Sequence, residues 1–332
     1  MERRAAIGVL GCGSYLPADT RSNEHIARDA GVSAEWIYSR TGVKYRRAAA
    51  PHEAASDLAL CALRSALAAA ELDADQLGLI VVATSTPDDL GPATACRVQH
   101  AAKASHAVAL DVGAACSGWL FAARVAHDWL RQDPGTGYAA VIGVEAYSKF
   151  VNPADRATAS LFGDGAAATI LGPVPEPYGF STFSLASDGA LADTVCIPGG
   201  GSRHPGGDHT IHMDGRAVRA FIVDNLPGII NDALKRHRIT VGDVDHFVTH
   251  QPNPLLLRQV ADQMGIPPQR LVVVGEDIGN IGAACIPYAL AHCAVQGRFA
   301  RGDRVLIAGF GAGFTWGSTL LTWCRSPAVR MY

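Results

Sequence analysis

The chain contains the run Val108-Ala109-Leu110-Asp111-Val112-Gly113-Ala114-Ala115-Cys116, in which a strand-like segment leads into a Gly-Ala-Ala-Cys turn. The same turn returns as Gly282-Ala283-Ala284-Cys285, after the strand-like segment 271–274. Each turn opens an Ala-rich helical segment, one reaching Leu130 and the other Val295. Because the same strand–helix order surrounds both copies, we predict that the chain consists of two similar halves.

Strand-like apolar runs alternate with helical segments along the whole chain. They lie at residues 79–83, 107–112, 139–144 and 166–171, and again at 247–250, 271–274, 305–308 and 320–323. This alternation predicts an α/β protein whose sheets are largely buried. Proline and glycine interrupt the pattern at residues 172–177, so we place the two halves at 1–173 and 174–332.

The composition narrows the class of protein. Hydrophobic residues make up 48% and charged residues 18%, as in globular proteins, and a net charge of −3 gives no basic field for nucleic acid. No apolar run approaches the roughly 20 residues that span a bilayer, and the start Met1-Glu2-Arg3-Arg4 leads into a stretch too short for a signal peptide. The eight cysteines form no CxxC pair, which favours reduced thiols. We therefore expect a cytoplasmic protein without a membrane partner.

Cys116 is a candidate nucleophile. It stands between a strand and a helix, where the positive end of the helix dipole is expected to lower the pKa of the thiol. The small residues around it would let a thioester approach the sulfur closely. Considered alone, however, such a cysteine is more often a buried packing residue, and Cys285 has a similar setting. The turn itself does not choose between the two.

Two polar residues of the second half complete a candidate set. His250 ends the strand-like run 247–250, and Asn280 lies in the Gly-rich loop 275–284. With a cysteine they supply a nucleophile and two neutral hydrogen-bond donors, as acyl transfer requires, although a lone loop histidine is more often structural. The Gly-rich run 309–318 lacks a dinucleotide fingerprint and is interpreted as a close backbone approach to a ligand, with a tight apolar turn as the alternative. No metal site is expected, because the histidines near residues 204–212 have no cysteine partners.

Taken together these segments resemble β-ketoacyl-acyl-carrier-protein synthase III, the condensing enzyme that starts fatty-acid and some polyketide chains. The resemblance runs nearly the whole length and rests on residues 35–42, 111–122, 156–165, 250–253, 279–280 and 309–318. The segment around Cys116 and the segment Phe314-Thr315-Trp316-Gly317 are highly specific in combination. The family implies a thiolase fold, with two similar halves in a five-layered αβαβα arrangement, and a homodimer.

The resemblance also implies a role for each matching residue. Cys116 would attack an acyl-CoA thioester and hold the acyl group, with the backbone N–H groups of Cys116 and Ala312 as the oxyanion hole. His250, preferably neutral, and Asn280 would hydrogen-bond the oxygen of a malonyl thioester as CO₂ leaves. Cys285 would be a packing residue. Coenzyme A thioesters would be substrates, with no separate cofactor, and their binding residues would be Trp36, Arg40, Arg156 and Asn253.

The sequence departs from the common family pattern near the acyl pocket. Gly91 stands where a bulky aromatic often closes the pocket across the dimer, and Ser160 stands where an aliphatic residue is common. Together with Phe162 they form the expected acyl pocket. We predict a primer that is larger than acetyl, or functionalised. After Asn280, Ile281 and Gly282 replace the usual Thr-Ser pair.

Docking of acyl carrier protein is less clearly indicated. Leu255, Asp262 and Gln263 occupy positions that are often basic in the family and contact the carrier, whereas Arg219 remains a match. The basic run 235–238 is either a solvated helix end or a docking patch for an acidic carrier. The malonyl group is therefore expected on either coenzyme A or a carrier protein.

Three hypotheses about activity follow. The leading one is a decarboxylative condensing enzyme. The second keeps acylation of Cys116 but passes the acyl group to an oxygen, nitrogen or carrier thiol without condensation. The third is a non-catalytic subunit of a heterodimer. An intact set of Cys116, His250 and Asn280 favours the first hypothesis, because simple transfer does not need the decarboxylation pair.

Overall fold

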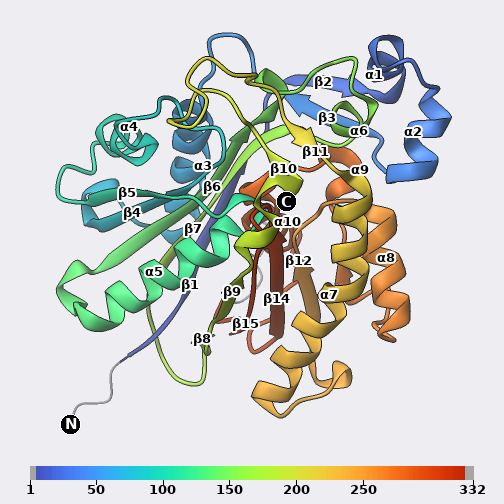
Figure 1. Ribbon diagram of the computed structural model, residues 1–332. Coiled ribbons are helices and arrows are strands. Elements are labelled where there is room, and N and C mark those ends of the chain that lie inside the picture. The colour runs from blue at the N-terminus through green and yellow to red at the C-terminus, as the bar shows by residue number, and fades with distance from the viewer. Residues whose placement is uncertain (1–4, 326–332) are drawn as a thin grey trace, which may run out of the picture.

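The computed structural model describes residues 5–325 as two large β-sheets with helices between them and outside them, together with the two-stranded sheets β2-β3 and β10-β11 (Figure 1). The first sheet has the order β1-β7-β6-β4-β5, with β1 Ala6–Tyr15, β4 Leu77–Ala83, β5 Val108–Val112, β6 Tyr138–Ala146 and β7 Asp164–Val174. The second has the order β13-β12-β14-β15-β8, with β8 Gly179–Phe180, β12 His246–Thr249, β13 Leu271–Val272, β14 Arg304–Gly311 and β15 Thr315–Thr322; β9 Ser184–Ser187 also pairs with β15. The expected lack of a signal peptide concerns Met1–Arg4, which lie outside the described residues.

The two sheets repeat one connection pattern. Strand β4 is parallel to β5 and β6, and β6 is antiparallel to β7. In the same way β12 is parallel to β13 and β14, and β14 is antiparallel to β15. The similarity of the halves that the Gly-Ala-Ala-Cys repeat predicts is therefore present in the topology. The division at residues 173 and 174 stays a prediction; strand β7 ends beside it, at Val174.

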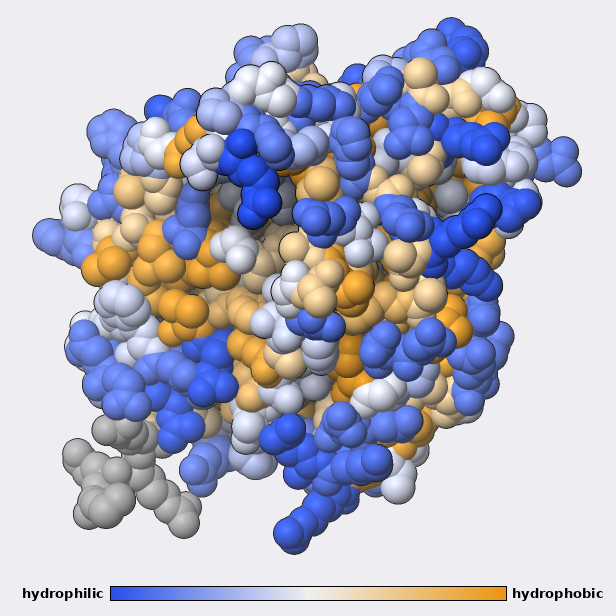
Figure 2. All heavy atoms as spheres, viewed as in Figure 1, coloured by the Kyte–Doolittle hydropathy of each residue, from blue (hydrophilic) through white to orange (hydrophobic). Residues whose placement is uncertain are grey.

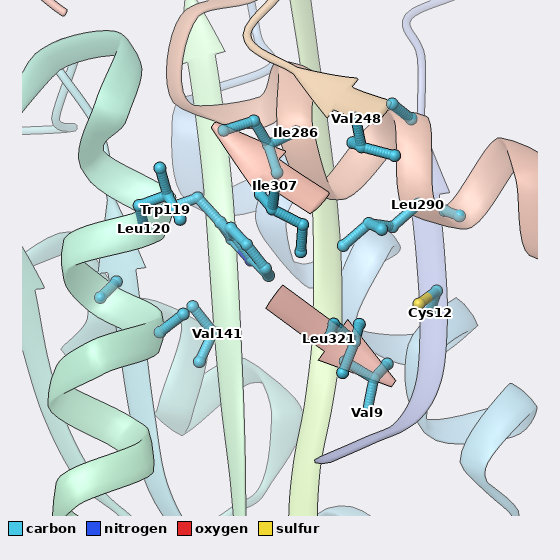
Figure 3. Packing of buried hydrophobic residues seen from close by; sticks show 14 of the residues in the cluster. Val9, Cys12, Trp119, Leu120, Val141, Val248, Ile286, Leu290, Ile307 and Leu321 are labelled. Carbon is cyan, nitrogen blue, oxygen red and sulfur yellow. The ribbon is translucent and has the colours of Figure 1, made fainter. Parts of the chain in front are cut away.

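Helices fill the space between the sheets and cover both outer faces. Helices α5 (Gly118–Gln132) and α10 (Cys285–Val295) lie in the middle, where Trp119 and Leu290 pack with Val141 of β6 and Ile307 of β14 (Figure 3). Helices α3 (Ala55–Ala70) and α4 (Thr94–Ala102) cover the first sheet. Helices α7 (Gly215–His237) and α8 (Pro254–Gln263) cover the second. The expected αβαβα arrangement of five layers is confirmed.

Strand β1 is the one long strand that the apolar runs did not predict. It carries glycines because α3 packs directly on its backbone. A Cβ at Gly11 would lie 2.5 Å from the carbonyl oxygen of Ala66, and one at Gly13 would lie 2.2 Å from the amide nitrogen of Ala66. Glycine weakens the strand signal in the sequence, but here it permits the close approach of helix and sheet.

Shorter elements gather at one end of the two sheets, at the top of Figure 1. They are β2 Asp19–Ser22, α1 Asn23–Ala30, α2 Ala34–Thr41, β3 Tyr45–Ala48, α6 Arg156–Ala159, β10 Val195–Cys196, β11 His212–Met213 and α9 Gly275–Ile278. Strands β4, β5, β6, β12 and β14 end toward this region, where ligands commonly bind in parallel sheets. Among the helices of residues 5–325, none has the length and apolar character to cross a membrane.

Candidate active site

The three candidate catalytic residues line one cavity of about 300 Å³. Cys116 follows β5, His250 directly follows β12, and Asn280 follows the short helix α9. Phe162 and Ala312 line the same cavity, the latter in the turn between β14 and β15. The structure thus brings together five residues that lie far apart in the sequence and belong to both halves.

Cys116 lies in a tight turn that the second half covers. The turn is the three-residue 3-10 segment Ala115–Ser117, and Ala115 has a φ of 45°, in the left-handed region that is costly for residues other than glycine. A Cβ at Gly311 would lie 2.7 Å from the backbone nitrogen of Cys116. Only glycine permits the end of β14 to lie so close, so Gly311 helps to set the position of the nucleophile.

Two hydroxyl groups join the Cys116 turn to the Ala312 turn. Ser117 donates to the carbonyl oxygen of Ala114 at 2.9 Å, and the Ser117 and Thr315 hydroxyls lie 2.7 Å apart. The Thr315 hydroxyl also lies 3.0 Å from the Ala114 carbonyl and 3.3 Å from the Ala312 carbonyl. These contacts fix the Cys116 turn relative to the Ala312 turn, and with them the two backbone N–H groups that are expected to form the oxyanion hole. The sequence analysis identified the run 309–318 but gave Thr315 no role.

The side-chain amide of Asn280 has a defined orientation. Its oxygen accepts a hydrogen bond from the backbone N–H of Gly282 at 2.9 Å, and the Cys285 thiol donates to the same oxygen at 3.6 Å. A backbone N–H only donates, so the amide oxygen faces Gly282 and the NH₂ group remains a donor for a ligand. On the backbone, Asn280 donates to the carbonyl of Leu161 and accepts from Gly163, at 2.8 and 3.0 Å. Cys285 is therefore a buried support for Asn280 as well as a packing residue.

His250 is a buried and neutral ring. It is 1% exposed, and its edge packs against Phe310 with ring centres 5.2 Å apart. Burial lowers the pKa of His250 to about 3, so the ring carries no charge near neutral pH. Within residues 5–325 its Nδ1 atom has no hydrogen-bond partner. Burial of His250 therefore favours the uncharged ring, which is the state preferred for hydrogen bonding to the oxygen of a malonyl thioester.

The expected lowering of the Cys116 pKa is wrong. Burial raises the pKa of the thiol above its ordinary value, the nearby Cys285 and Glu145 raise it further, and a hydrogen bond from Tyr147 opposes them. The physical reason is that the thiol sits between the two sheets, one turn before α5 begins at Gly118. For the Cys116 thiol, removal from water therefore outweighs the helix dipole.

The sequence analysis did not identify Glu145 and Tyr147 as residues near the candidate site. Glu145 lies at the end of β6 with no exposed surface, and its carboxylate accepts from the backbone N–H of Ser85 at 3.1 Å and the Thr86 hydroxyl at 3.0 Å. Burial raises the pKa of Glu145 to about 8. Tyr147 lines the cavity beside Cys116. The one available signal was an acidic residue directly after the apolar run 139–144, in a strand buried on both faces.

A second cavity, of about 920 Å³, leads into the first. The two share Met213, Val218, Pro252 and Asn280 as lining residues, so we refer to them as the entrance cavity and the inner cavity. The entrance cavity is lined by all four residues expected to bind coenzyme A, namely Trp36, Arg40, Arg156 and Asn253. It is also lined by the cations Arg216 and Arg219 at the start of α7.

The four residues expected to bind coenzyme A make different contacts within the entrance cavity. The guanidinium carbons of Arg40 and Arg156 lie 5.9 and 5.5 Å from the centre of the Trp36 ring. Asn253 instead caps helix α8, because its side-chain oxygen accepts from the N–H groups of Leu255 and Leu256 at 2.9 and 3.1 Å. Its NH₂ group donates to the carbonyl of Arg40 at 3.0 Å. The side-chain amide of Asn253 thus already has hydrogen-bond partners within the protein, whereas the charged groups of Arg40 and Arg156 face the cavity.

Comparisons with known proteins agree with this site. The family model for 3-oxoacyl-[acyl-carrier-protein (ACP)] synthase III matches residues 110–189, and the model for its C-terminal part matches residues 234–323. The chain is 41% identical to the acetoacetyl CoA synthase NphT7 of Streptomyces sp. (strain CL190) over 329 residues, which is 95% of this chain and 98% of that protein. This chain belongs to the 3-oxoacyl-[acyl-carrier-protein] synthase III family.

Further members of the family agree in sequence and in fold. The β-ketoacyl-[acyl-carrier-protein] synthase III of Symbiobacterium thermophilum is 40% identical over 329 residues, 96% of this chain and 98% of that protein. The crystal structure of 3-oxoacyl-(acyl carrier protein) synthase III from Pseudomonas aeruginosa PAO1 superposes with a TM-score of 0.90 at 37% identity, over 97% of this chain and 99% of that one. The thiolase fold expected from the resemblance is confirmed.

The three residues expected at the acyl pocket of this synthase III lie in different places. Phe162 lines the inner cavity, and its ring centre is 4.8 Å from that of Tyr147. Ser160 is buried but lines the entrance cavity, and its carbonyl accepts from Arg46 at 2.7 Å. Gly91 lines neither cavity, and a Cβ there would meet nothing within 4 Å. Of the three, Phe162 alone reaches the inner cavity within a single chain.

Proposed function

We propose that this chain transfers an acyl group from acyl-CoA to Cys116 and condenses it with a malonyl thioester, giving a β-ketoacyl product. The observation that carries the proposal is the inner cavity, in which Cys116 lies with a neutral His250 and an Asn280 amide oriented as a donor. Transfer without condensation would require the nucleophile but not the two donors. Membership of the synthase III family supports the same activity.

In the acylation step the sulfur of Cys116 attacks the thioester carbonyl. The carbonyl oxygen becomes negative and accepts hydrogen bonds from the backbone N–H groups of Cys116 and Ala312, whose turns the Thr315 hydroxyl joins. The bond from carbon to the sulfur of coenzyme A then breaks. Coenzyme A leaves as a thiol, and the acyl group remains on Cys116.

In the condensation step a malonyl thioester loses CO₂. The electrons of the broken carbon–carbon bond pass to an enolate, whose oxygen accepts hydrogen bonds from His250 and the NH₂ group of Asn280. One such donor contributes about 3 to 4 kcal/mol in well-studied enzymes. The enolate carbon attacks the acyl carbonyl, the bond to Cys116 breaks, and the β-ketoacyl thioester leaves.

The inner cavity favours an apolar primer. Beyond the catalytic residues its wall is formed mainly by apolar side chains, namely Phe162, Val195, Ile197, Ile211 and Phe314. We propose that these residues surround an acyl chain longer than acetyl. The segment 195–213, in which the sequence analysis considered only the histidines as metal ligands, supplies part of this wall.

A homodimer through strand β5 would give Gly91 a role. Strand β5 is the edge of the first sheet, Val108 on it is 47% exposed, and Leu90 is 85% exposed. Figure 2 shows apolar side chains gathered over this edge, on the left of the molecule. The N–H of Thr94 donates to Asp111 of β5 at 2.7 Å, which holds the segment that follows Gly91 beside the strand. We propose that a second copy of the chain covers this edge and that Gly91 enlarges the acyl pocket there.

The entrance cavity suits a phosphorylated carrier. Arg40, Arg156, Arg216 and Arg219 line it, as phosphate recognition requires. Leu255 at its rim is 39% exposed and apolar where a carrier protein would meet a cation. Together with the similarity to an acetoacetyl CoA synthase, this supports coenzyme A as carrier of the malonyl group. We place the reaction in the cytoplasm, with no cofactor besides these thioesters.

One experiment tests the proposal. The purified protein is incubated with a panel of acyl-CoAs, its intact mass is recorded, and malonyl-CoA or malonyl carrier protein is added. We expect an adduct that disappears with release of CO₂ and a β-ketoacyl product, faster with malonyl-CoA. The His250→Ala variant is the control, in which the adduct forms but persists. Discharge of the wild-type adduct onto an amine, alcohol or carrier thiol, without CO₂, would overturn the proposal.

A further inference from the structure

The side chain of Gln251, the residue after His250, joins the segment of one enolate donor to the segment of the other. We propose that Gln251 is a positioning residue for condensation, whose buried amide sets the separation between His250 and Asn280. The inference deepens the proposed function, on which it rests, by naming what holds the two donors in place. The sequence analysis gave Gln251 no role.

The amide of Gln251 is buried, and all of its hydrogen-bonding capacity is used. The residue is 1% exposed. Its NH₂ group donates to the carbonyl oxygens of Thr249 and Val272, both at 3.0 Å. Its oxygen accepts from the backbone N–H groups of Val274 and Gly275 at 2.9 and 3.3 Å. An amide has two donors and two acceptor sites, and here each of them has a backbone partner.

These bonds begin where the pairing of strands β12 and β13 ends. The two strands are parallel neighbours, and the last pair in register is Val248 opposite Val272. Beyond this pair the amide of Gln251 continues the connection between the two segments. A side chain thus takes the place of the backbone ladder at the edge of the inner cavity.

The single-turn helix α9 carries this constraint to Asn280. Val274 is the N-cap of α9 and Gly275 is its first residue. Gly279, which closes the turn, donates to the carbonyl of Gly275 at 3.0 Å, and Asn280 follows it directly. The hydrogen bonds from Val274 and Gly275 to Gln251 therefore fix the start of a turn that ends beside Asn280.

His250 depends on its backbone for its position. Its Nδ1 atom has no hydrogen-bond partner within residues 5–325, and its ring packs against Phe310. Its backbone N–H donates to the carbonyl of Ala308 in β14 at 3.1 Å. The carbonyl just before it, that of Thr249, accepts from Gln251. Strand β14 and Gln251 thus both constrain the backbone that carries the His250 ring.

Other contacts hold the residues expected to act in acylation. The Ser117 and Thr315 hydroxyls join the Cys116 turn to the Ala312 turn, and none of the four hydrogen bonds of the Gln251 amide reaches either turn. Loss of this amide should therefore displace the enolate donors relative to each other and leave the oxyanion donors in place. A misplacement of about 1 Å can slow a reaction by about 10²-fold.

The test measures the two steps separately in Gln251→Met, which keeps the length of the side chain and removes all four hydrogen bonds. We expect acylation, followed by intact mass, to stay within about 2-fold of wild type. Condensation of the preformed acyl enzyme with saturating malonyl-CoA should be about 10²-fold slower, as a loss of kcat. Wild-type condensation, or equal losses in the two steps, would overturn the inference.

Two further variants sharpen this test. Gln99→Met is the matched control, because the amide of Gln99 on helix α4 also donates to a backbone carbonyl, that of Ala104 at 2.9 Å; both steps should be as in wild type. Gln251→Asn, with an amide one CH₂ group shorter, serves where Gln251→Met does not fold. It should show the same split, with condensation about 10-fold slower. Equal rates in both steps of Gln251→Asn and wild type would also overturn the inference.

A double-variant cycle distinguishes positioning from a general loss of stability. In the Asn280→Ala background one of the two donors is already absent, so Gln251→Met should slow condensation by less than about 10-fold. Losses that multiply to their full product would show that Gln251 acts independently of Asn280, and the inference would be wrong.

A crystal structure of Gln251→Met separates the inference from the proposed function, because it needs no substrate. The distance between the His250 ring and the Asn280 amide should differ from that in the wild type by about 1 Å or more. If the wild-type adduct never condenses but this distance changes, the condensation assignment fails and the positioning role stands. If the distance is the same in both proteins, the positioning role is wrong.

Discussion

The turns that contain Cys116 and Cys285 share one backbone conformation, but the two cysteines stand at different places in it. Both are short 3-10 segments that lead into a helix of the middle layer. Cys116 is half-buried and lines the inner cavity, whereas Cys285 has no exposed surface and its thiol donates to Asn280. Cys116 is the middle residue of its 3-10 segment, whereas Cys285 follows its segment and is the first residue of α10, so the two cysteines do not occupy equivalent positions in the duplicated fold.

The two turns also differ in the strand of the opposite half that packs against each of them. Gly311, at the end of β14, covers the Cys116 turn and is followed by Ala312, which lines the inner cavity and is an expected oxyanion donor. Gly143, within β6, covers the other turn, where a Cβ would lie 2.2 Å from the carbonyl of Ala283. Strand β6 then continues to Glu145 rather than to a second oxyanion donor. The surroundings of the two cysteines thus differ both in their place in the turn and in the neighbours across the middle layer.

The largest expected effect is the loss of Cys116. Cys116→Ala should form no acyl adduct and should lose condensation by at least about 10³-fold, because it removes the thiol that the proposed reaction acylates. Cys285→Ala should still form the adduct, with a loss of condensation below about 10-fold and of stability near 1 kcal/mol. Intact mass and product formation measure both. An adduct of full yield on Cys116→Ala would show that Cys116 is not the nucleophile.

Removing either donor should separate the two steps of the reaction. His250→Ala and Asn280→Ala should each reduce condensation by about 10² to 10³-fold, since each removes one hydrogen bond to the enolate oxygen. Acylation of Cys116 should change little in either variant. Rates of adduct formation and of CO₂ release give the comparison. Equal losses in both steps would contradict the assignment of these residues to decarboxylation.

Gly311 should matter more to the nucleophile than other glycines do. In Gly311→Ala the new methyl group meets the Cys116 backbone at 2.7 Å, so the turn must shift. We expect slower acylation and a free energy of unfolding lower by about 1 to 3 kcal/mol. Gly189→Ala, where a Cβ meets nothing within 4 Å, is the control for both measurements. A wild-type rate of acylation in Gly311→Ala would show that the contact between Gly311 and the Cys116 backbone does not affect the reaction.

The smallest expected effect is that of pH on condensation. Because the pKa of His250 is lowered to about 3, its cationic form is reached only in strong acid, and the neutral ring is present throughout the range from about pH 5 to about pH 7. A preformed acyl enzyme mixed with malonyl-CoA should therefore condense at one rate across this range. A loss of rate with a midpoint near the ordinary histidine value of about 6.5 would contradict a buried neutral His250.

The two similar halves and the candidate set of Cys116, His250 and Asn280, which the structure brings into one cavity, were predictable from local signals together with the family resemblance. Strand and helix periods, the repeated turn, and a histidine at a strand end can be read in short windows. The contact of Thr315 with Ala114 escaped prediction because it joins segments that lie far apart in the chain. The pKa of Cys116 was predicted with the wrong sign for a related reason, since burial between the sheets is a property of the whole fold. The role of Gly91 depends on a second copy of the chain.

The most direct test of the account is to locate the acyl group in the wild-type protein. The protein is acylated with the preferred acyl-CoA, digested, and mapped by mass spectrometry before and after addition of malonyl-CoA. The account predicts an adduct on the peptide that contains Cys116, none on the peptide that contains Cys285, and loss of the adduct as the β-ketoacyl product appears. An adduct on Cys285, or one on Cys116 that malonyl-CoA leaves in place, would contradict it.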